Sequence, residues 1–378
     1  MRLDFEPAGR SLSLEGAEGW RDRFHAIWLR DSCSCRQCRR PETNERLLDS
    51  TGIDHDLTIV DAAVRNGRLQ LEFSDGHRTE LASDFLAQHA PSRWDKAENP
   101  LVGRRGRSDG RDGLGSSPAS LPASFQRQDL EERAGLGHFV DALWVDGAAL
   151  VRSVEPTEAG LLGVAGLIGH VLPSNYGRTW TVEATVDPYS AVDSELGLKV
   201  HTDLPYRQSP PGLQLILAVI ADVEGGASTL VDGFTMAERL RAENRRWWQL
   251  LTSVPFAYSF RRPGTHLERA SPLLSLESDG RYQQVRRAPD LVGSPVVQAD
   301  DVPELYEALA RWSHLLDDPE NQVEVRLESG DVLAFDNHRM LHGRSAFELG
   351  STGRRLLRGC YLDIDELTNR RALLADRG

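Results

Sequence analysis

The chain has 378 residues, with 57 acidic and 44 basic side chains and a formal net charge of −13. This charge argues against a nucleic-acid partner, because binding to a phosphate backbone depends on clustered Lys and Arg. No stretch of about 18 uninterrupted apolar residues predicts a membrane span, and the N-terminus has no basic segment followed by an apolar one. We therefore expect a cytoplasmic protein that binds neither nucleic acid nor membrane and is long enough for two domains.

Residues 1–96 are predicted to form a small β domain. Apolar and polar residues alternate in short runs broken by Gly, Asp and Asn, which is typical of strands. These runs cover residues 10–15, 24–31, 57–64 and 67–81. The turn-forming segment SDG at 74–76 places His77 at the start of a strand.

Residues 97–124 are rich in Gly, Ser, Pro and charged side chains and contain almost nothing to bury. This composition predicts a flexible linker. Its basic run, RRGRSDGR at 104–111, could contact phosphate, but it is short, interrupted by Asp and has no neighbouring aromatic residue.

Residues 125–378 are predicted to form a second, mainly β domain. Strands are expected at 146–154, 180–186, 196–203, 213–220, 228–234, 255–260, 281–286, 323–337 and 355–363. Helices are expected at 156–172, 235–254 and 302–318, where apolar residues recur at helical spacing. Many strands with a few helices predict a sandwich or barrel with helices packed against it.

Three separated residues in this domain are candidate metal ligands. His201 and Asp203 end a strand-like run at i and i+2, so both side chains point to the same face. His342 lies far downstream in DNHRMLHGR, and His338 in the same segment competes with it. Two imidazoles and one carboxylate that leave open positions are typical of non-haem Fe(II) oxygenases.

Three of the four cysteines fall within six residues, Cys33, Cys35 and Cys38. In an intracellular chain such a cluster more often binds a metal than forms disulfides. The fourth, Cys360, stands alone and is expected to be structural.

Six stretches together resemble one family. They are WLRDSCSCRQCRRPETNERLLD, HTDLPY, PPGLQL, GGASTLVDGF, NHRMLHGR and RLLRGCYLD. In order and spacing they are similar to the γ-butyrobetaine hydroxylase and trimethyllysine hydroxylase family of 2-oxoglutarate-dependent oxygenases, which are relatives of taurine dioxygenase. About four-fifths of the chain is covered. The resemblance implies a double-stranded β-helix, or jelly-roll, catalytic domain at 125–378 and an N-terminal zinc-binding β domain at 1–96.

The resemblance also assigns the catalytic residues. It implies Fe(II) bound by His201, Asp203 and His342, the last because the family's ligand precedes Gly-Arg. Arg355 would hold the distal carboxylate of 2-oxoglutarate, a task that suits the guanidinium fork, with Ser228 near the cosubstrate. The implied reaction uses O₂, converts 2-oxoglutarate to succinate and CO₂, and hydroxylates a small molecule. A homodimer is also implied.

The second metal site implied by the resemblance is structural. Cys33, Cys35 and Cys38 with His77 would bind Zn(II). Three thiolates and one imidazole make a closed tetrahedral set, which is the signature of structural zinc. We expect the metal to contribute to folding of the small N-terminal domain.

The substrate pocket matches the family in part. Tyr176, Trp180 and Tyr361 fall at the positions of an aromatic cage that attracts a trimethylammonium head. A further cage tyrosine of the family is Asp193 here, and Leu204 stands where an aromatic residue is expected. Asp193 could attract a cation through its charge instead.

The family's Asn-rich substrate-binding segment reads QVRRAPD at 284–290. Arg286 or Arg287 would bind a carboxylate or phosphonate more strongly than an amide, and because alternate residues of a strand face opposite ways, one of the two could lie on a solvated face instead. We therefore expect a cationic or zwitterionic, betaine-like substrate. One alternative is a hydroxylase of the phosphonate analogue 2-trimethylaminoethylphosphonate. Another is a catalytically inactive, zinc-stabilised binding protein, against which the intact His201, Asp203, His342 and Arg355 count.

Overall fold

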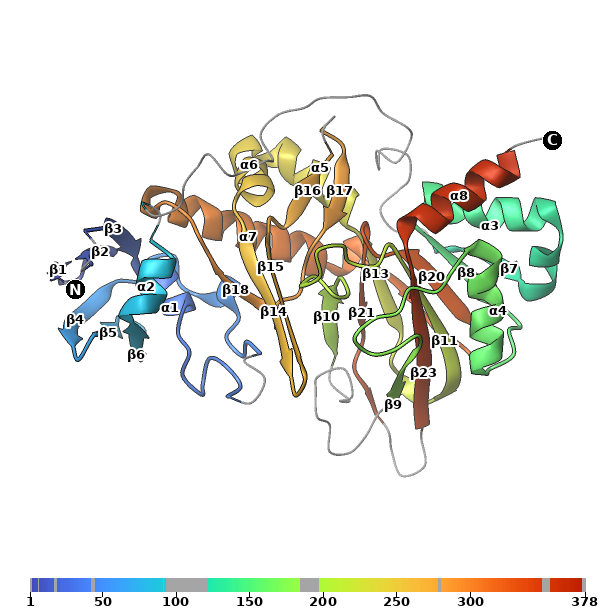
Figure 1. Ribbon diagram of the computed structural model, residues 1–378, viewed down its shortest axis with the longest axis horizontal. Helices are drawn as coiled ribbons and strands as arrows, with labels where there is room; N and C mark the ends of the chain where they lie inside the picture. Colours follow the sequence, from blue (N-terminus) through green and yellow to red (C-terminus); the bar gives the residue numbers. More distant parts are fainter. Residues whose placement is uncertain are drawn as a thin grey trace. The chain divides into compact units, whose positions relative to one another are not determined.

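A computed structural model describes residues 2–5, 7–16, 19–41, 45–90, 92, 121–183, 197–277, 280–348 and 354–375 (Figure 1). The chain divides into two compact units. The first comprises Met1–Gly106, Arg239–Gly280 and Ala288–His314, and the second comprises Arg107–Glu238, Arg281–Arg287 and Leu315–Gly378. The predicted domain boundaries at residues 96 and 125 are not tested by this division and stay predictions. Most of the predicted linker lies outside the described residues, as does Asp193.

In the described part of the first unit there are three antiparallel sheets of three strands each. Their orders are β1-β2-β3, β4-β5-β6 and β15-β14-β18. The strands are β1 Arg2–Phe5, β2 Ser11–Glu15, β3 Arg21–His25, β4 Ile59–Arg65, β5 Arg68–Phe73, β6 Arg78–Ala82, β14 Phe256–Arg262, β15 Thr265–Ser271 and β18 Val292–Pro295, with β16 at Leu274–Leu276. The helices are α1 Ala26–Asp31, α2 Ser83–Gln88, α6 Arg245–Ser253 and most of α7 Val302–Asp317.

The predicted strand at 24–31 is wrong, because the chain leaves β3 at His25 and continues as helix α1. The His25 ring nitrogen Nδ1 accepts a hydrogen bond from the backbone of Ile27 and so caps the helix. All six residues of α1 are buried. A short apolar run that is buried on every side does not distinguish a strand from a helix.

The second unit is built on two sheets. Their orders are β7-β8-β20-β11-β23-β9 and β10-β21-β13-β19. The strands of the first are β7 Ala123–Gln126, β8 Ala148–Arg152, β9 Trp180–Glu183, β11 Leu213–Asp222, β20 Val332–Asp336 and β23 Arg354–Leu362. Those of the second are β10 Leu198–His201, β13 Ser228–Asp232, β19 Val323–Val325 and β21 Met340–Arg344. The remaining strands are β12 Glu224–Gly225, β17 Tyr282–Val285 and β22 Phe347–Glu348, and the helices are α3 Arg133–Val145, α4 Glu158–Ile168, α8 Ile364–Ala375 and part of α5 Gly233–Glu243.

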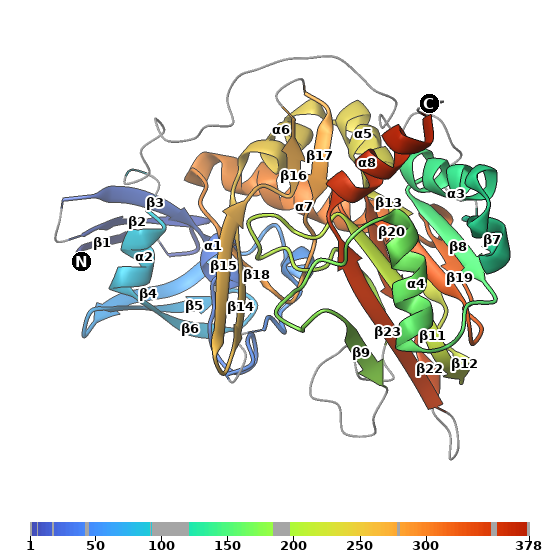
Figure 2. The ribbon, with the colours of Figure 1, turned by 45° about the vertical axis from the view of Figure 1, so that its right-hand side comes forward.

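Strand β11 shows how the six-stranded sheet packs on both faces. Leu213, Leu215 and Leu217 belong to a core with residues of α3, α4 and α8. Ile216 and Ala218 point the other way, into a core with residues of the four-stranded sheet. Alternate residues of a strand face opposite sides, so one strand supplies both cores. Figure 2 shows the three helices against this sheet, and the predicted jelly-roll fold with packed helices is confirmed.

The predicted helix at 235–254 is two helices. It breaks at Asn244, whose side chain accepts hydrogen bonds from the backbone of Arg246 and Trp247 and caps α6. Helices α3 and α8 were not predicted. Among the described residues, no helix is long and apolar enough to cross a membrane.

Candidate functional site

The three candidate metal ligands of the second unit converge. Strand β10 pairs with β21 so that His201 lies opposite His342. The ring centroids of the two histidines are 4.3 Å apart. The Asp203 oxygen Oδ1 lies 3.4 Å from Nε2 of His201 and 3.8 Å from Nε2 of His342. One ligand atom from each residue lies within 4.8 Å of the other two, so a single ion can reach all three.

The electrostatic surroundings of these groups favour metal binding. Burial lowers the pKa of His342 to about 3, and the charge of His201 adds to this, so the imidazole is neutral near pH 7. Burial alone would raise the pKa of Asp203, but the contacts with His201, His342 and Tyr361 outweigh it and lower that pKa. A neutral imidazole and an ionised carboxylate are the protonation states that a metal ion requires.

Two neighbours hold Asp203, one through its carboxylate and one through its backbone. The Tyr361 hydroxyl donates to Oδ2 over 2.7 Å. The Asn337 side chain accepts from the Asp203 backbone N–H over 2.8 Å and donates to its carbonyl over 3.2 Å. His338 hydrogen-bonds to the Pro210 carbonyl and is not part of the three-residue cluster. Two imidazoles and one carboxylate fit an iron site that leaves positions open for other ligands.

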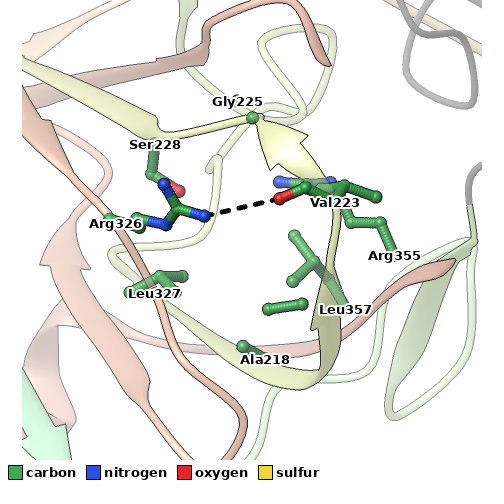
Figure 3. A pocket seen from close by; sticks show the side chains of 10 residues that line it. Ala218, Val223, Gly225, Ser228, Arg326, Leu327, Arg355 and Leu357 are labelled. Atoms are coloured by element: carbon green, nitrogen blue, oxygen red, sulfur yellow. Dashed lines mark hydrogen bonds between the residues drawn. The ribbon is translucent and has the colours of Figure 1, made fainter. Parts of the chain in front are cut away.

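A pocket in the same unit contains the two predicted cosubstrate residues. Its lining includes Ser228, Arg326, Arg355 and Leu357 (Figure 3). Arg326 reaches from one side and donates to the Val223 carbonyl over 3.5 Å. Arg326 was not predicted as a site residue; it lies one residue beyond the end of β19.

A second arginine, also missed, lies beside Arg355. The guanidinium carbons of Arg344 and Arg355 are 4.6 and 5.5 Å from the Phe347 ring centroid. Arg344 also pairs with Ser228 across strands β21 and β13. Burial, together with the charge of Arg344, lowers the pKa of Arg355 to about 10. Two buried cations side by side favour an anionic ligand. The position of Arg344 could have been predicted, because it lies two residues after His342 in the same strand and alternate residues share a face.

Of the predicted cage residues, Tyr361 contacts the candidate metal ligand Asp203 and also packs against Trp180. The rings of Trp180 and Tyr361 are 5.8 Å apart. Trp180 packs across Gly359, where a Cβ atom would come within 2.1 Å of the indole. Tyr176 is 43% exposed, whereas Tyr361 is buried.

Tyr206 is a further aromatic residue that the sequence analysis missed. Its hydroxyl donates to the Asn175 side chain over 3.4 Å, and its ring is buried. Burial raises the pKa of Tyr206, and the neighbouring Tyr176 adds to the shift. Among the described residues, two buried donors near these rings have no hydrogen-bond partner, Trp180 Nε1 and Asn175 Nδ2. A buried unpaired donor is costly, which suits a site that receives a ligand.

Arg286 and Arg287 are buried and directed at the protein's own oxygens. Arg286 donates to the carbonyls of Pro205, Arg207 and Gln208. Arg287 forms a two-pronged ion pair with Asp317. The predicted contact of these arginines with substrate stays a prediction.

In the first unit, the four predicted zinc ligands also converge. Nε2 of His77 lies 3.2, 3.8 and 3.7 Å from the sulfurs of Cys33, Cys35 and Cys38. A tetrahedral site with Zn–S near 2.3 Å and Zn–N near 2.0–2.1 Å places sulfur and nitrogen about 3.5 Å apart. The donor set and its spacing therefore fit zinc.

Further side chains support the zinc cluster. Thr79 donates to the Cys33 sulfur over 3.0 Å, and Arg30 lies 3.4 Å from the Cys38 sulfur. Arg30 also pairs with Asp75, which accepts a hydrogen bond from the His77 backbone. Such partners orient metal ligands and stabilise thiolate charge.

Comparison with known proteins agrees with both halves of the chain. Residues 113–361 match the model of the taurine catabolism dioxygenase TauD, TfdA family. Residues 3–83 match the model described as γ-butyrobetaine hydroxylase-like, N-terminal.

Two relatives and one solved structure are similar over much of their length. The γ-butyrobetaine dioxygenase of Pseudomonas sp. (strain AK-1) is 32% identical over 95% of this chain and 92% of its own. The mitochondrial trimethyllysine dioxygenase of Gallus gallus is 30% identical over 93% of this chain and 83% of its own. A taurine dioxygenase structure from Burkholderia xenovorans is 18% identical, covers 65% of this chain and 89% of that one with a TM-score of 0.50, and supports the fold alone.

The resemblance inferred from six short stretches is thus confirmed over nearly the whole chain. The relatives are dioxygenases, and the chain keeps the two histidines and the carboxylate that such chemistry needs. The chain belongs to the taurine catabolism dioxygenase TauD, TfdA family.

Proposed function

We propose that this dioxygenase hydroxylates an unactivated C–H bond of a trimethylammonium zwitterion such as γ-butyrobetaine, using Fe(II), 2-oxoglutarate and O₂ and releasing succinate and CO₂. The observation that carries the proposal is the convergence of His201, Asp203 and His342. The similarity to a γ-butyrobetaine dioxygenase over 95% of the chain supports the substrate class.

In this proposal the second unit binds both metal and cosubstrate. His201, Asp203 and His342 hold Fe(II), which with 2-oxoglutarate supplies the oxidising chemistry when bound. Arg355 binds the distal carboxylate of 2-oxoglutarate, with Ser228 lining the same pocket. The nearby Arg344 raises the positive potential there, which favours a dianion.

The substrate's cationic head binds between aromatic rings. Tyr176, Trp180 and Tyr361 offer ring faces to a trimethylammonium group, which has no N–H to donate and is held by cation–π attraction. The donors Trp180 Nε1 and Asn175 Nδ2 are available for a polar group of the substrate. Asp193, which lies outside the described residues, is proposed as an additional charge for the cation.

The remaining proposals concern the zinc site, the domain boundaries, the oligomeric state and the cellular location. Zn(II) bound by Cys33, Cys35, Cys38 and His77 stabilises the first unit. The domains are proposed as 1–96 and 125–378, joined by the linker 97–124. The homodimer and the cytoplasmic location also stay proposals, and sedimentation of the purified protein tests the dimer.

The experiment is succinate release from 2-oxoglutarate with Fe(II) and ascorbate, on a panel of trimethylammonium carboxylates and phosphonates. We expect turnover with a carboxylate, whereas turnover with the phosphonate alone would favour the alternative substrate. If no compound is turned over and the protein does not bind Fe(II), the proposed enzymatic activity is refuted. His342→Ala should abolish turnover and keep the zinc content, and loss of both would show that the two metal sites are wrongly separated.

A further inference from the structure

The pair Arg286-Arg287 lies against both sides of the His201–Asp203 motif. The two residues follow strand β17 directly, and both are buried, with exposed fractions of 2% for Arg286 and 5% for Arg287. Arg287 exchanges two hydrogen bonds with Thr202, the residue between the two metal ligands. Its N–H donates to the Thr202 hydroxyl over 3.0 Å, and its carbonyl accepts from the Thr202 N–H over 2.8 Å.

The Arg286 guanidinium holds the segment that follows Asp203. It donates to the carbonyls of Pro205, Arg207 (2.8 Å) and Gln208 (3.1 Å). With its amide oriented to satisfy both groups, Gln284 accepts from Arg286 Nη2 and Nε over 2.7 and 3.1 Å. These acceptors are uncharged and, apart from Gln284, belong to one short turn.

The turn needs support because its first residue is strained. Leu204, directly after Asp203, has φ of +55°. A branched side chain in the left-handed region costs roughly 1–3 kcal/mol, and such a conformation persists only where the surroundings enforce it. The carbonyls that Arg286 binds begin at the very next residue.

The Arg287 guanidinium holds the opposite side of the motif. It donates to the carbonyl of Val200, the residue before His201, over 2.9 Å. It is itself fixed by Asp317, at 3.0 and 3.1 Å. One dipeptide therefore reaches both ends of the motif.

We propose that Arg286 and Arg287 are positioning residues that brace the iron-binding motif, holding Val200 on one side and the strained turn 204–208 on the other. The brace fixes the backbone from which His201 and Asp203 project, and so sets their separation before metal binds. The proposal rests on the proposed iron site. It gives these arginines a different role from the predicted substrate contact, for which a bound anion would have to displace the carbonyls and the Asp317 carboxylate from these guanidinium groups.

The test measures metal affinity apart from turnover. Zinc-replete protein is titrated with Co(II), and binding is followed by visible absorption. The part of the signal that is lost in His342→Ala belongs to the iron site. Arg286→Gln and Arg287→Gln are compared with the parent. The matched control is Arg152→Gln, which removes an arginine paired with Asp331 elsewhere in the same unit. Circular dichroism and thermal unfolding establish that each variant is folded.

We expect Arg286→Gln and Arg287→Gln to raise the Co(II) dissociation constant by roughly 10-fold or more, as for other residues that orient metal ligands. Arg286→Lys, which keeps the charge but not the fork, should fall between, and it replaces Arg286→Gln if that variant does not fold. Leu204→Gly, which relieves the strain, should reduce the penalty of Arg286→Gln when the two are combined. Arg152→Gln should bind Co(II) like the parent.

Two outcomes would contradict the positioning role of Arg286 and Arg287. Unchanged Co(II) affinity with a raised KM for a trimethylammonium carboxylate would mean that the arginines contact substrate instead. Equal losses in Arg152→Gln would mean that the effect is general destabilisation. If the proposed iron site itself is wrong, the result is distinguishable, because the parent and His342→Ala would then give the same Co(II) titration.

Discussion

Replacing Tyr361 with Phe separates two roles that one side chain combines in the proposed site. The ring packs against Trp180, with centroids 5.8 Å apart, and the hydroxyl donates to Asp203 Oδ2 over 2.7 Å. Tyr361→Phe removes the hydroxyl and keeps the ring. Tyr361→Leu removes both.

The magnitude follows from the charge and burial of the acceptor. A hydrogen bond to a charged group contributes about 1.5–3 kcal/mol, and 1.4 kcal/mol is a factor of ten in an equilibrium constant. Tyr361 is buried and its bond is short, so we expect Tyr361→Phe to weaken metal binding by roughly 10- to 100-fold. The matched control is Tyr206→Phe, whose hydroxyl contacts a neutral amide over 3.4 Å and should matter less than about threefold.

The assay combines Co(II) titration with succinate release at saturating metal. Tyr361→Phe should lose metal affinity while its KM for a trimethylammonium carboxylate stays close to that of the parent. Tyr361→Leu should in addition raise that KM, because the aromatic face is gone. If Tyr361→Phe binds Co(II) as tightly as Tyr206→Phe, the hydroxyl does not orient Asp203 and the reasoning is refuted.

Three further predictions concern other parts of the chain. Arg355→Lys should raise the KM for 2-oxoglutarate by roughly 10-fold or more, because an ammonium group lacks the two-pronged fork, and an unchanged KM in succinate assays would exclude Arg355 from the cosubstrate site. Cys38→Ser should lose zinc by elemental analysis and lower the unfolding temperature, with Co(II) binding at the iron site retained; normal zinc content would contradict the cluster. Burial and the charges of Arg10 and Arg23 lower the pKa of His25 to about 4, so below about pH 6.5 the unfolded chain binds a proton that the folded chain takes up only near pH 4. The free energy of unfolding should therefore decrease as the pH is lowered from about 6.5 to about 4, by up to about 1.4 kcal/mol per pH unit. Denaturant titration at each pH measures this dependence, and His25→Asn should flatten it.

Strand β11 was predicted because a run of apolar residues is a local signal. The expected strand at 213–220 covers all but the last two residues of Leu213–Asp222, and its residues face two cores. Helix α1 was missed because six buried residues in succession carry no period that distinguishes a helix from a strand. The break at Asn244 depends on a side chain that caps the next helix, which the helical spacing of apolar residues on both sides conceals.

The candidate site was predictable where a motif carries its own chemistry. His201, Asp203 and His342 could be named because few residue types bind iron, although only the pairing of β10 with β21 brings them together. Arg286 shows where such reasoning ends. Its charge suggested an anionic ligand, yet its guanidinium group donates to backbone carbonyls, which every residue has and no sequence pattern reveals.

The proposed cosubstrate is a dianion and the proposed substrate has a cationic head group, and strand β23 explains how one site can bind these two groups in different places. Arg355 lies near its start and Tyr361 near its end, six residues apart and on the same face, which corresponds to about 20 Å of extended chain. The start of the strand adjoins Arg344 and the cationic pocket, where a dianion is favoured and a trimethylammonium group is repelled. The end adjoins Asp203 and Trp180, where a cation is attracted and a second carboxylate is disfavoured. Because both ends belong to one rigid strand, 2-oxoglutarate and a betaine-like substrate can meet at the metal without competing for each other's place.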